Sequence, residues 1–312
     1  EISACLVGSE MCIETGYRLI DTASSYKNED SIGRGIRASG IPRENFFITT
    51  KVWNTAQRVG DIEGAFNRSL DRLRLDYVDL YLIHWPVPGC YPETWRALEK
   101  IRESGRAKSI GVSNFEEPHL TALFEFSGII PAVNQIECHP LWNRKPLIAF
   151  CRSHGIAVQA YAPLARGLYL NREIMQQLAE KYVRTEAQIG LRYLVQQGIS
   201  VIPKSTQPDR IFANADVFDF ELSEADMALI DTMDEQLRSA SIPDDLLNCG
   251  FTEKAAQKIC FFPFQISVLL FLFLFISRIP SSLLQVQIQS PIASASSNHA
   301  CLLYTSDAAD EA

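Results

Sequence analysis

Short apolar runs alternate with amphipathic helical segments from Gly16 to Asp234, and this rhythm limits the folds that the chain can adopt. The runs start at intervals of roughly thirty residues, the length of one strand-plus-helix unit. Most are apolar at successive positions, as expected of strands that helices cover on both faces. The rhythm predicts a parallel sheet with right-handed crossovers. The predicted strands are Tyr17–Asp21, Phe46–Val52, Val78–His84, Ser109–Val112, Ala132–Glu137, Ala157–Tyr161 and Ser200–Ile202.

The segments between these strands carry signals for the starts and ends of helices. Pro92 suits the first turn of a helix that Gly105 ends, and Thr185 with Gln188 forms a capping box. Gly198 gives a stop signal after that second helix. Strands and helices therefore alternate regularly.

Seven strands in one such series favour an α/β fold, a TIM (β/α)8 barrel. The alternative is a doubly wound Rossmann sheet, and GRGIRA at Gly33–Ala38 matches its G-x-G-x-x-A motif. That motif must open a helix directly after a strand. Here Asn28, Glu29 and Asp30 already signal a helix start upstream, so we expect these glycines inside a helix.

The two ends of the chain differ from the segment between them. Only seven strands are found, and the residues before Gly16 are too few for a strand, a loop and a helix, so we expect the first βα unit to be missing. Met11–Ile13 and Cys301–Ser306 can be encoded by the same short DNA sequence read in opposite directions. That DNA sequence is the end of a transposase adapter used in sequencing libraries. We hypothesise that residues 1–15 are adapter-derived, that 16–248 form the incomplete barrel and that 249–312 are a non-native or disordered tail.

The tail contains an apolar stretch at 261–276 that is shorter than a usual membrane span and includes Gln265 and Ser267. A tail anchor and in-frame read-through of untranslated sequence are the two interpretations, and we favour read-through. We therefore expect no membrane partner.

Composition narrows the possible partners and the cellular compartment. The formal net charge of −8, without a basic run, disfavours nucleic acid as a partner. The eight cysteines include no C-x-x-C pair, which indicates reduced thiols in a cytoplasmic protein. We expect a monomer.

Polar side chains end three consecutive predicted strands. They are Asp21, Lys51 and His84, and Tyr26 lies in the loop after the first strand. Each alone has an ordinary explanation, such as a core histidine or a packed tyrosine. In a barrel, however, chemistry is carried at the carboxyl ends of the strands, so we expect the four to meet there.

Together these residue types make a proton donor. A free tyrosine, with a pKa near 10, is a weak acid for an alkoxide that forms at neutral pH. A lysine ammonium beside it stabilises the phenolate, and a carboxylate keeps that lysine charged and oriented. A neutral imidazole can then align a substrate carbonyl.

Seven ordered motifs resemble the aldo-keto reductase family: GYRLIDTA, TTKVW, YLIHWP, IGVSNF, NQIECHP, YAPLARG and IPKS. WPVPGCYPETW and YAPLARG are similar to the branch with prostaglandin F synthase-like and 2,5-diketogluconate reductase-like enzymes. The resemblance implies that Tyr26 is the general acid, that Asp21 and Lys51 tune it and that His84 orients the carbonyl.

The resemblance also implies an NADPH (NADP+) site. Ser113, Asn114 and Gln135 would hold the nicotinamide carboxamide while Tyr161 stacks on the ring. The other implied cofactor contacts are Asp21, Leu164, Lys204, Ser205, Arg210 and Asn214. In this set Lys204, Ser205 and Arg210 would bind the 2′-phosphate, and Asn214 would contact the adenine. A lysine and an arginine at the start of a helix are suited to binding a phosphate. Ala213 departs from the family, where many members carry an acid.

The implied function is NADPH-dependent reduction of aldehydes or ketones, small-molecule carbonyl substrates, by hydride transfer. Trp53 and Trp85 resemble substrate-pocket aromatics, with core packing as the alternative for each. A non-catalytic NADPH-binding barrel, similar to channel subunits or structural relatives, is the alternative function. A metal-dependent hydrolase is disfavoured because no His-x-His occurs among the five histidines, so we expect no metal.

Overall fold

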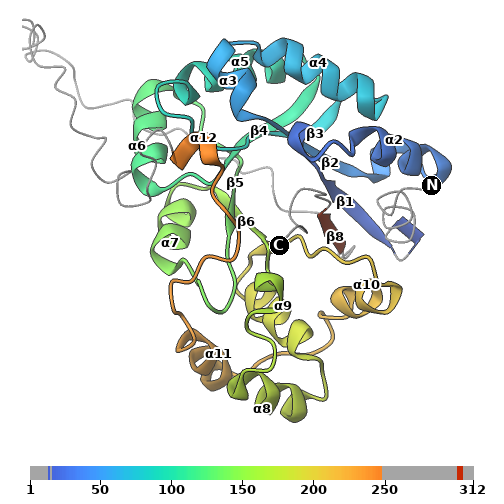
Figure 1. Ribbon diagram of the computed structural model, residues 1–312, viewed down its shortest axis with the longest axis vertical. Helices are drawn as coiled ribbons and strands as arrows, with labels where there is room; N and C mark the ends of the chain where they lie inside the picture. The colour runs from blue at the N-terminus through green and yellow to red at the C-terminus, as the bar shows by residue number, and fades with distance from the viewer. Residues whose placement is uncertain (1–12, 15, 248–300, 305–312) are drawn as a thin grey trace, which may run out of the picture.

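The computed structural model describes residues 13–14, 16–247 and 301–304. Its strands form one curved parallel sheet with helices along its outer side (Figure 1). The strand order is β7-β6-β5-β4-β3-β2-β1-β8. The strands are β1 (Tyr17–Asp21), β2 (Phe47–Val52), β3 (Val78–Ile83), β4 (Ala107–Ser113), β5 (Val133–Glu137), β6 (Ala157–Tyr161), β7 (Ser200–Val201) and β8 (Cys301–Tyr304).

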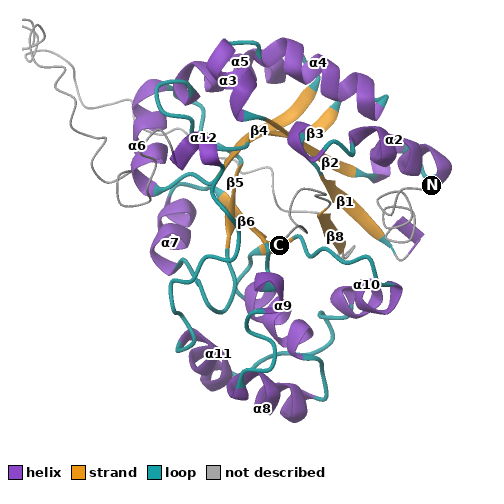
Figure 2. Cartoon of the chain, in the orientation of Figure 1, coloured by secondary structure: helices purple, strands orange, loops and turns teal. Residues whose placement is uncertain are grey.

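Helices follow the strands along the chain, as Figure 2 shows. The α-helices within residues 16–247 are α2 (Glu29–Ala38), α3 (Asn54–Val59), α4 (Ile62–Leu73), α5 (Tyr91–Glu103), α6 (Glu117–Phe126), α7 (Lys145–Ser153), α8 (Glu173–Tyr182), α9 (Glu186–Gln196), α10 (Pro208–Ala215), α11 (Glu224–Asp231) and α12 (Asp244–Leu247). Three short 3-10 turns are η1 (Ser24–Tyr26), η2 (Arg43–Asn45) and η3 (Ala165–Gly167). The predicted capping box is confirmed at the start of α9, where the Gln188 amide donates to Thr185 Oγ1 over 3.2 Å.

The predicted class, an α/β fold of the TIM-barrel type, is confirmed, and the seven predicted strands are β1 to β7. The structure adds an eighth strand that we did not predict. β8 comes from the segment assigned to the tail, and its register places Leu302 beside Leu19 and Tyr304 beside Asp21. An apolar run such as CLLY can pair in this way because β1 is an edge of the seven-strand series. The rest of the expected tail and most of residues 1–15 lie outside the described residues.

The glycines of the rejected Rossmann motif lie inside α2, as expected. A side-chain carbon on Gly33 would come 2.1 Å from the backbone oxygen of Leu73, at the end of α4. Gly33 therefore permits close contact between two helices that cover the sheet.

Because the strands are parallel, their carboxyl ends lie at the same end of the sheet. Asp21 ends β1, Lys51 is near the end of β2, and Ser113 ends β4. His84 and Asn114 directly follow their strands. This arrangement brings residues that are far apart in the sequence to one site.

No helix within the described part of the chain is long and apolar enough to cross a membrane. The apolar stretch at 261–276 lies outside the described residues.

Candidate active site

A cavity of about 960 Å³ opens at the carboxyl ends of the strands. Its lining includes most of the residues that the sequence predicted for catalysis, substrate and nicotinamide: Tyr26, Trp53, His84, Trp85, Ser113, Asn114, Gln135 and Tyr161. This volume is typical of a small-molecule site.

A buried ion pair lies behind this cavity. The Lys51 ammonium contacts Asp21 Oδ2, and both side chains are completely buried. Lys51 Nζ also donates to the backbone oxygen of Thr22 over 3.1 Å. Burial raises the pKa of Asp21 and lowers the pKa of Lys51, and the attraction between the two charges opposes both shifts. Each charge is therefore tolerated in the core only because the other is present.

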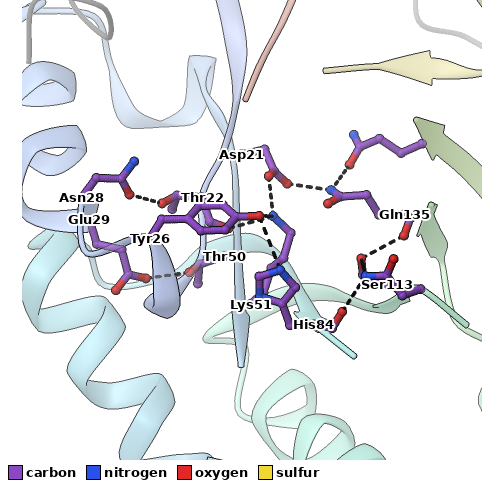
Figure 3. Close-up of polar contacts among 12 residues, drawn as sticks. Asp21, Thr22, Tyr26, Asn28, Glu29, Thr50, Lys51, His84, Ser113 and Gln135 are labelled. Carbon is purple, nitrogen blue, oxygen red and sulfur yellow. Dashed lines mark hydrogen bonds and ion pairs between the residues drawn. The ribbon is translucent and has the colours of Figure 1, made fainter. Parts of the chain in front are cut away.

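The phenol of Tyr26 lies between the lysine and the histidine. Its oxygen is 3.4 Å from Lys51 Nζ and 3.4 Å from His84 Nε2 (Figure 3). The Lys51 ammonium also lies 4.9 Å from the centre of the Tyr26 ring. The hydroxyl thus has a cation on one side and an imidazole on the other.

Polar contacts hold the loop that carries Tyr26 (Figure 3). Thr22 Oγ1 donates to Asn28 Oδ1 over 2.7 Å, which ties the end of β1 to the start of α2. Thr50 Oγ1 donates to Glu29 Oε1 over 2.6 Å, which ties α2 to β2. Tyr26 is therefore positioned from both neighbouring strands.

His84 lies against aromatic side chains, and its ring is nearly perpendicular to those of Tyr26 and Trp53, with centroids 5.5 Å and 4.9 Å away. Burial, together with the nearby Lys51 charge, lowers the pKa of His84 well below 6.5. The imidazole is therefore neutral near pH 7.

We expect the His84 imidazole to stay neutral as the pH falls from about 8 to 5, where an ordinary histidine becomes protonated. The unfolded chain takes up the proton below 6.5 and the folded chain does not, so the free energy of unfolding decreases with falling pH in that window. An NMR titration of the His84 imidazole checks this. Titration of His84 near 6.5 would contradict it.

The predicted nicotinamide residues form one hydrogen-bonded network. Gln135 Nε2 donates to Asp21 Oδ1 over 2.7 Å, so the network reaches the ion pair. Tyr161 donates to Asn114 Oδ1 over 2.7 Å, and Asn114 Nδ2 donates to the His84 backbone oxygen over 3.0 Å. Ser113 Oγ donates to the Gln135 backbone oxygen over 2.9 Å. The amide and aromatic side chains are thus fixed relative to Asp21 and His84.

The other predicted cofactor residues lie outside the residues that line this cavity. Lys204 and Arg210 are exposed, on the loop after β7 and in the first turn of α10. Ser205 precedes that helix, and its Oγ accepts from the Gln207 amide over 3.1 Å. Asn214 is buried within α10, and Leu164 is half-buried before η3. The structure thus separates an enclosed set of residues from an exposed cationic set.

Among the described residues, no cluster of three or more His, Cys, Asp or Glu side chains is placed to hold a metal ion. Cys90, Cys138 and Cys151 are free thiols. Burial raises the pKa of Cys138 to about 12, so this thiol is unreactive near neutral pH.

Comparison with known proteins assigns the family. The model of the Aldo/keto reductase family matches residues 9–235 of this chain. The chain belongs to the aldo/keto reductase family. This is a family of oxidoreductases whose members act on carbonyl compounds. The match begins at residue 9, within the 1–15 segment, and the adapter origin of that segment stays a prediction. The assignment to a branch of the family also stays a prediction.

Individual relatives resemble the chain over most of their own length. The glyoxal reductase of Bacillus subtilis (strain 168) is 49% identical over 235 residues, 75% of this chain and 85% of the relative. The 9,11-endoperoxide prostaglandin H2 reductase of Trypanosoma cruzi (strain CL Brener) is 46% identical over 241 residues, which cover 76% of this chain and 85% of the relative. A crystal structure of the Bombyx mori aldo-keto reductase in complex with NADP matches with a TM-score of 0.74 and 39% identity, over 80% of this chain and 88% of that one.

Several residues around the site of this aldo-keto reductase were not predicted. Gln159 Oε1 accepts from Gln135 Nε2 over 2.6 Å. Arg238 contacts the Tyr161 hydroxyl and lies close to Glu137 and to the Trp142 ring. Glu137 had a signal, because it is an acid at the end of a predicted strand. Arg238 had none, because it lies beyond the last predicted strand.

Proposed function

We propose that the chain is an NADPH-dependent oxidoreductase that reduces aldehydes or ketones to alcohols, with Tyr26 as the general acid. The observation that carries this proposal is the position of the Tyr26 hydroxyl, 3.4 Å from both Lys51 Nζ and His84 Nε2 at the wall of the cavity. A carbonyl oxygen beside Tyr26 and His84 would meet a proton donor and a neutral imidazole together.

Each residue of the cluster has one role in the proposal. The Tyr26 hydroxyl gives its proton to the carbonyl oxygen as the alcohol forms. The Lys51 ammonium stabilises the phenolate that remains, and Asp21 keeps that ammonium charged in a buried site. His84, held neutral by burial, orients the carbonyl without competing as an acid.

The side chains at the cavity fit a nicotinamide cofactor. An aromatic ring, Tyr161, and the polar side chains of Ser113, Asn114 and Gln135 line the same space, a set suited to stacking and to holding a carboxamide. NADPH supplies the hydride when it is bound. Lys204 and Arg210, near the amino end of α10, are suited to its 2′-phosphate, with Ser205, Asn214 and Leu164 as further contacts.

The substrate is proposed as a small carbonyl compound, with Trp53 and Trp85 as walls of its pocket. The names of the relatives, glyoxal reductase and prostaglandin H2 reductase, support a carbonyl-reducing or related activity. In this proposal residues 16–248 form the catalytic unit, which acts as a monomer in the cytoplasm.

Oxidation of NADPH by the full chain, followed by absorbance with a small aromatic aldehyde, tests the function. We expect NADPH to be used in preference to NADH, and Arg210→Ala to raise the KM for NADPH about tenfold to a hundredfold while leaving NADH use unchanged, because a charge-assisted contact to phosphate is lost. Arg106→Ala, which removes an exposed ion pair with Glu63, is the control. Binding of NADPH without its oxidation would favour the non-catalytic barrel.

A further inference from the structure

A buried carboxylate holds the loop that leads from α11 to α12. Glu137, at the carboxyl end of β5, is 1% exposed. Its Oε1 accepts hydrogen bonds from the backbone amides of Ser239 and Ala240 over 2.6 Å and 3.1 Å. The Ser239 hydroxyl donates to the same oxygen over 2.5 Å. These three loop donors share Oε1 with the His139 ring, whose Nε2 lies 3.1 Å away, and they fix this part of the loop to the barrel.

The neighbouring arginine connects the same carboxylate to the nicotinamide side of the cavity. Arg238 Nη2 donates to the Tyr161 hydroxyl over 2.9 Å, and its Nε lies 3.5 Å from Glu137 Oε2. The guanidinium also lies 5.4 Å from the Trp85 ring and 5.2 Å from the Trp142 ring. Arg238 therefore contacts a tyrosine and a tryptophan that both line the cavity.

The contacts continue to the proton-donor residues. Tyr161 donates to Asn114 Oδ1, and Asn114 Nδ2 donates to the His84 backbone oxygen. A displacement of Arg238 would remove the guanidinium donor to the Tyr161 hydroxyl. The loop and the catalytic histidine are thus linked by consecutive hydrogen bonds.

From Ala240 onward, the loop and the first residues of α12 form a wall of the cavity. Ala240, Ser241, Pro243, Asp244 and Asp245 all line it. The far end of this wall is also held, because Asn54 Nδ2 and Arg58 Nη2 lie 3.3 Å and 3.2 Å from Asp245 Oδ2. The wall therefore lies between two points of attachment, one at β5 and one at α3.

We propose that Glu137, Arg238 and Ser239 form a loop clamp that sets the substrate side of the cavity, with Glu137 and Arg238 as positioning residues. The clamp holds residues 238–245 at a fixed place relative to Tyr161 and Trp85, so it determines how closely the wall meets a bound carbonyl compound. The proposal rests on the proposed function, because the space that it shapes is the one assigned to the substrate. Its contribution is to substrate binding and not to proton transfer at Tyr26.

The kinetic test uses Arg238→Met, which keeps a long apolar side chain near Trp85 and Trp142 and removes the guanidinium. We expect the KM for the aldehyde to rise about tenfold, the effect of losing a hydrogen bond to a charged group, while kcat changes less than threefold. Arg238→Lys restores a cation and recovers part of the KM. Arg184→Met is the matched control, since Arg184 pairs with Asp216 and Asp219 away from the cavity.

Hydrogen exchange of the loop amides provides a readout that does not need catalysis. The backbone amides of Ser239 and Ala240 donate to Glu137, so we expect them to exchange slowly in the unaltered chain. Glu137→Met removes the acceptor oxygens and should speed their exchange at least tenfold. Ser239→Ala removes only the hydroxyl, so it should give a smaller increase in exchange, and it replaces Glu137→Met as the test if that variant does not fold.

The outcomes separate this proposal from the proposed function. Faster loop exchange together with a raised aldehyde KM supports the clamp. Faster exchange with an unchanged KM overturns its role in substrate binding, and unchanged exchange overturns the clamp itself. If the chain never oxidises NADPH but the Glu137 variant still exchanges its loop amides faster, the proposed function is contradicted. Glu137 would then still be shown to hold the loop.

Discussion

Replacement of Tyr26 by phenylalanine is expected to lower the turnover number for aldehyde reduction by about a hundredfold to ten-thousandfold, the usual contribution of a positioned general acid. The change removes one hydroxyl from a ring that is 8% exposed, and that oxygen is 3.4 Å from both Lys51 Nζ and His84 Nε2. The ring itself remains, so the packing against His84 is kept.

Because the Tyr26 hydroxyl is not among the expected cofactor contacts, we expect the dissociation constant of NADPH to stay within threefold in this variant. Tyr193→Phe is the matched control. It removes a hydroxyl that donates to Asp231 over 2.6 Å between α9 and α11, and it should leave turnover unchanged. Loss of NADPH binding in Tyr26→Phe would point to a damaged site instead of a missing proton donor.

Replacement of Lys51 by methionine is expected to reduce both activity and stability. The lysine and Asp21 are completely buried together, so Lys51→Met leaves an unpaired carboxylate in the core. Breaking a buried pair on one side costs about 3 to 5 kcal/mol of the free energy of unfolding. Turnover should fall at least a hundredfold, because the phenolate of Tyr26 loses its stabilising cation. Denaturant unfolding and NADPH oxidation measure the two effects.

The double variant Asp21→Asn with Lys51→Met separates these effects. It removes both charges, so we expect it to recover part of the lost stability but none of the lost activity. Lys108→Met is the control on the same sheet. Lys108 is about half exposed and shares Asp79 with Arg43, so Asp79 keeps a partner and the stability should change by less than about 1 kcal/mol. Equal stability losses for Lys51→Met and Lys108→Met would contradict the account.

The strands, and the meeting of Asp21, Lys51 and His84 at one site, could be predicted because both follow from local patterns. A buried parallel strand is apolar at successive positions, and β1 and β6 were predicted with the bounds that the structure has. The carboxyl ends of parallel strands meet, so Asp21, Lys51 and His84 could be expected at one site without knowledge of any contact.

Contacts between distant segments could not be predicted in this way. Ser239 and Glu137 are 102 positions apart, and no periodicity relates a loop after α11 to the end of β5. The pairing of β8 with β1 is of the same kind, since it depends on an edge being open and not on a pattern near residue 301. Roles that depend on a bound cofactor, such as those of Lys204 and Arg210, stay predictions because these side chains are exposed and lie outside the cavity lining.

The most direct test of the account is a single-turnover reaction of the full chain with NADPH and an excess of a small aldehyde. NADPH oxidation and alcohol formation are followed in the unaltered chain and in Tyr26→Phe. The account predicts one alcohol formed for each NADPH oxidised, at a rate at least a hundredfold lower in Tyr26→Phe. Equal rates in the two chains, or NADPH that binds and is never oxidised, would contradict it.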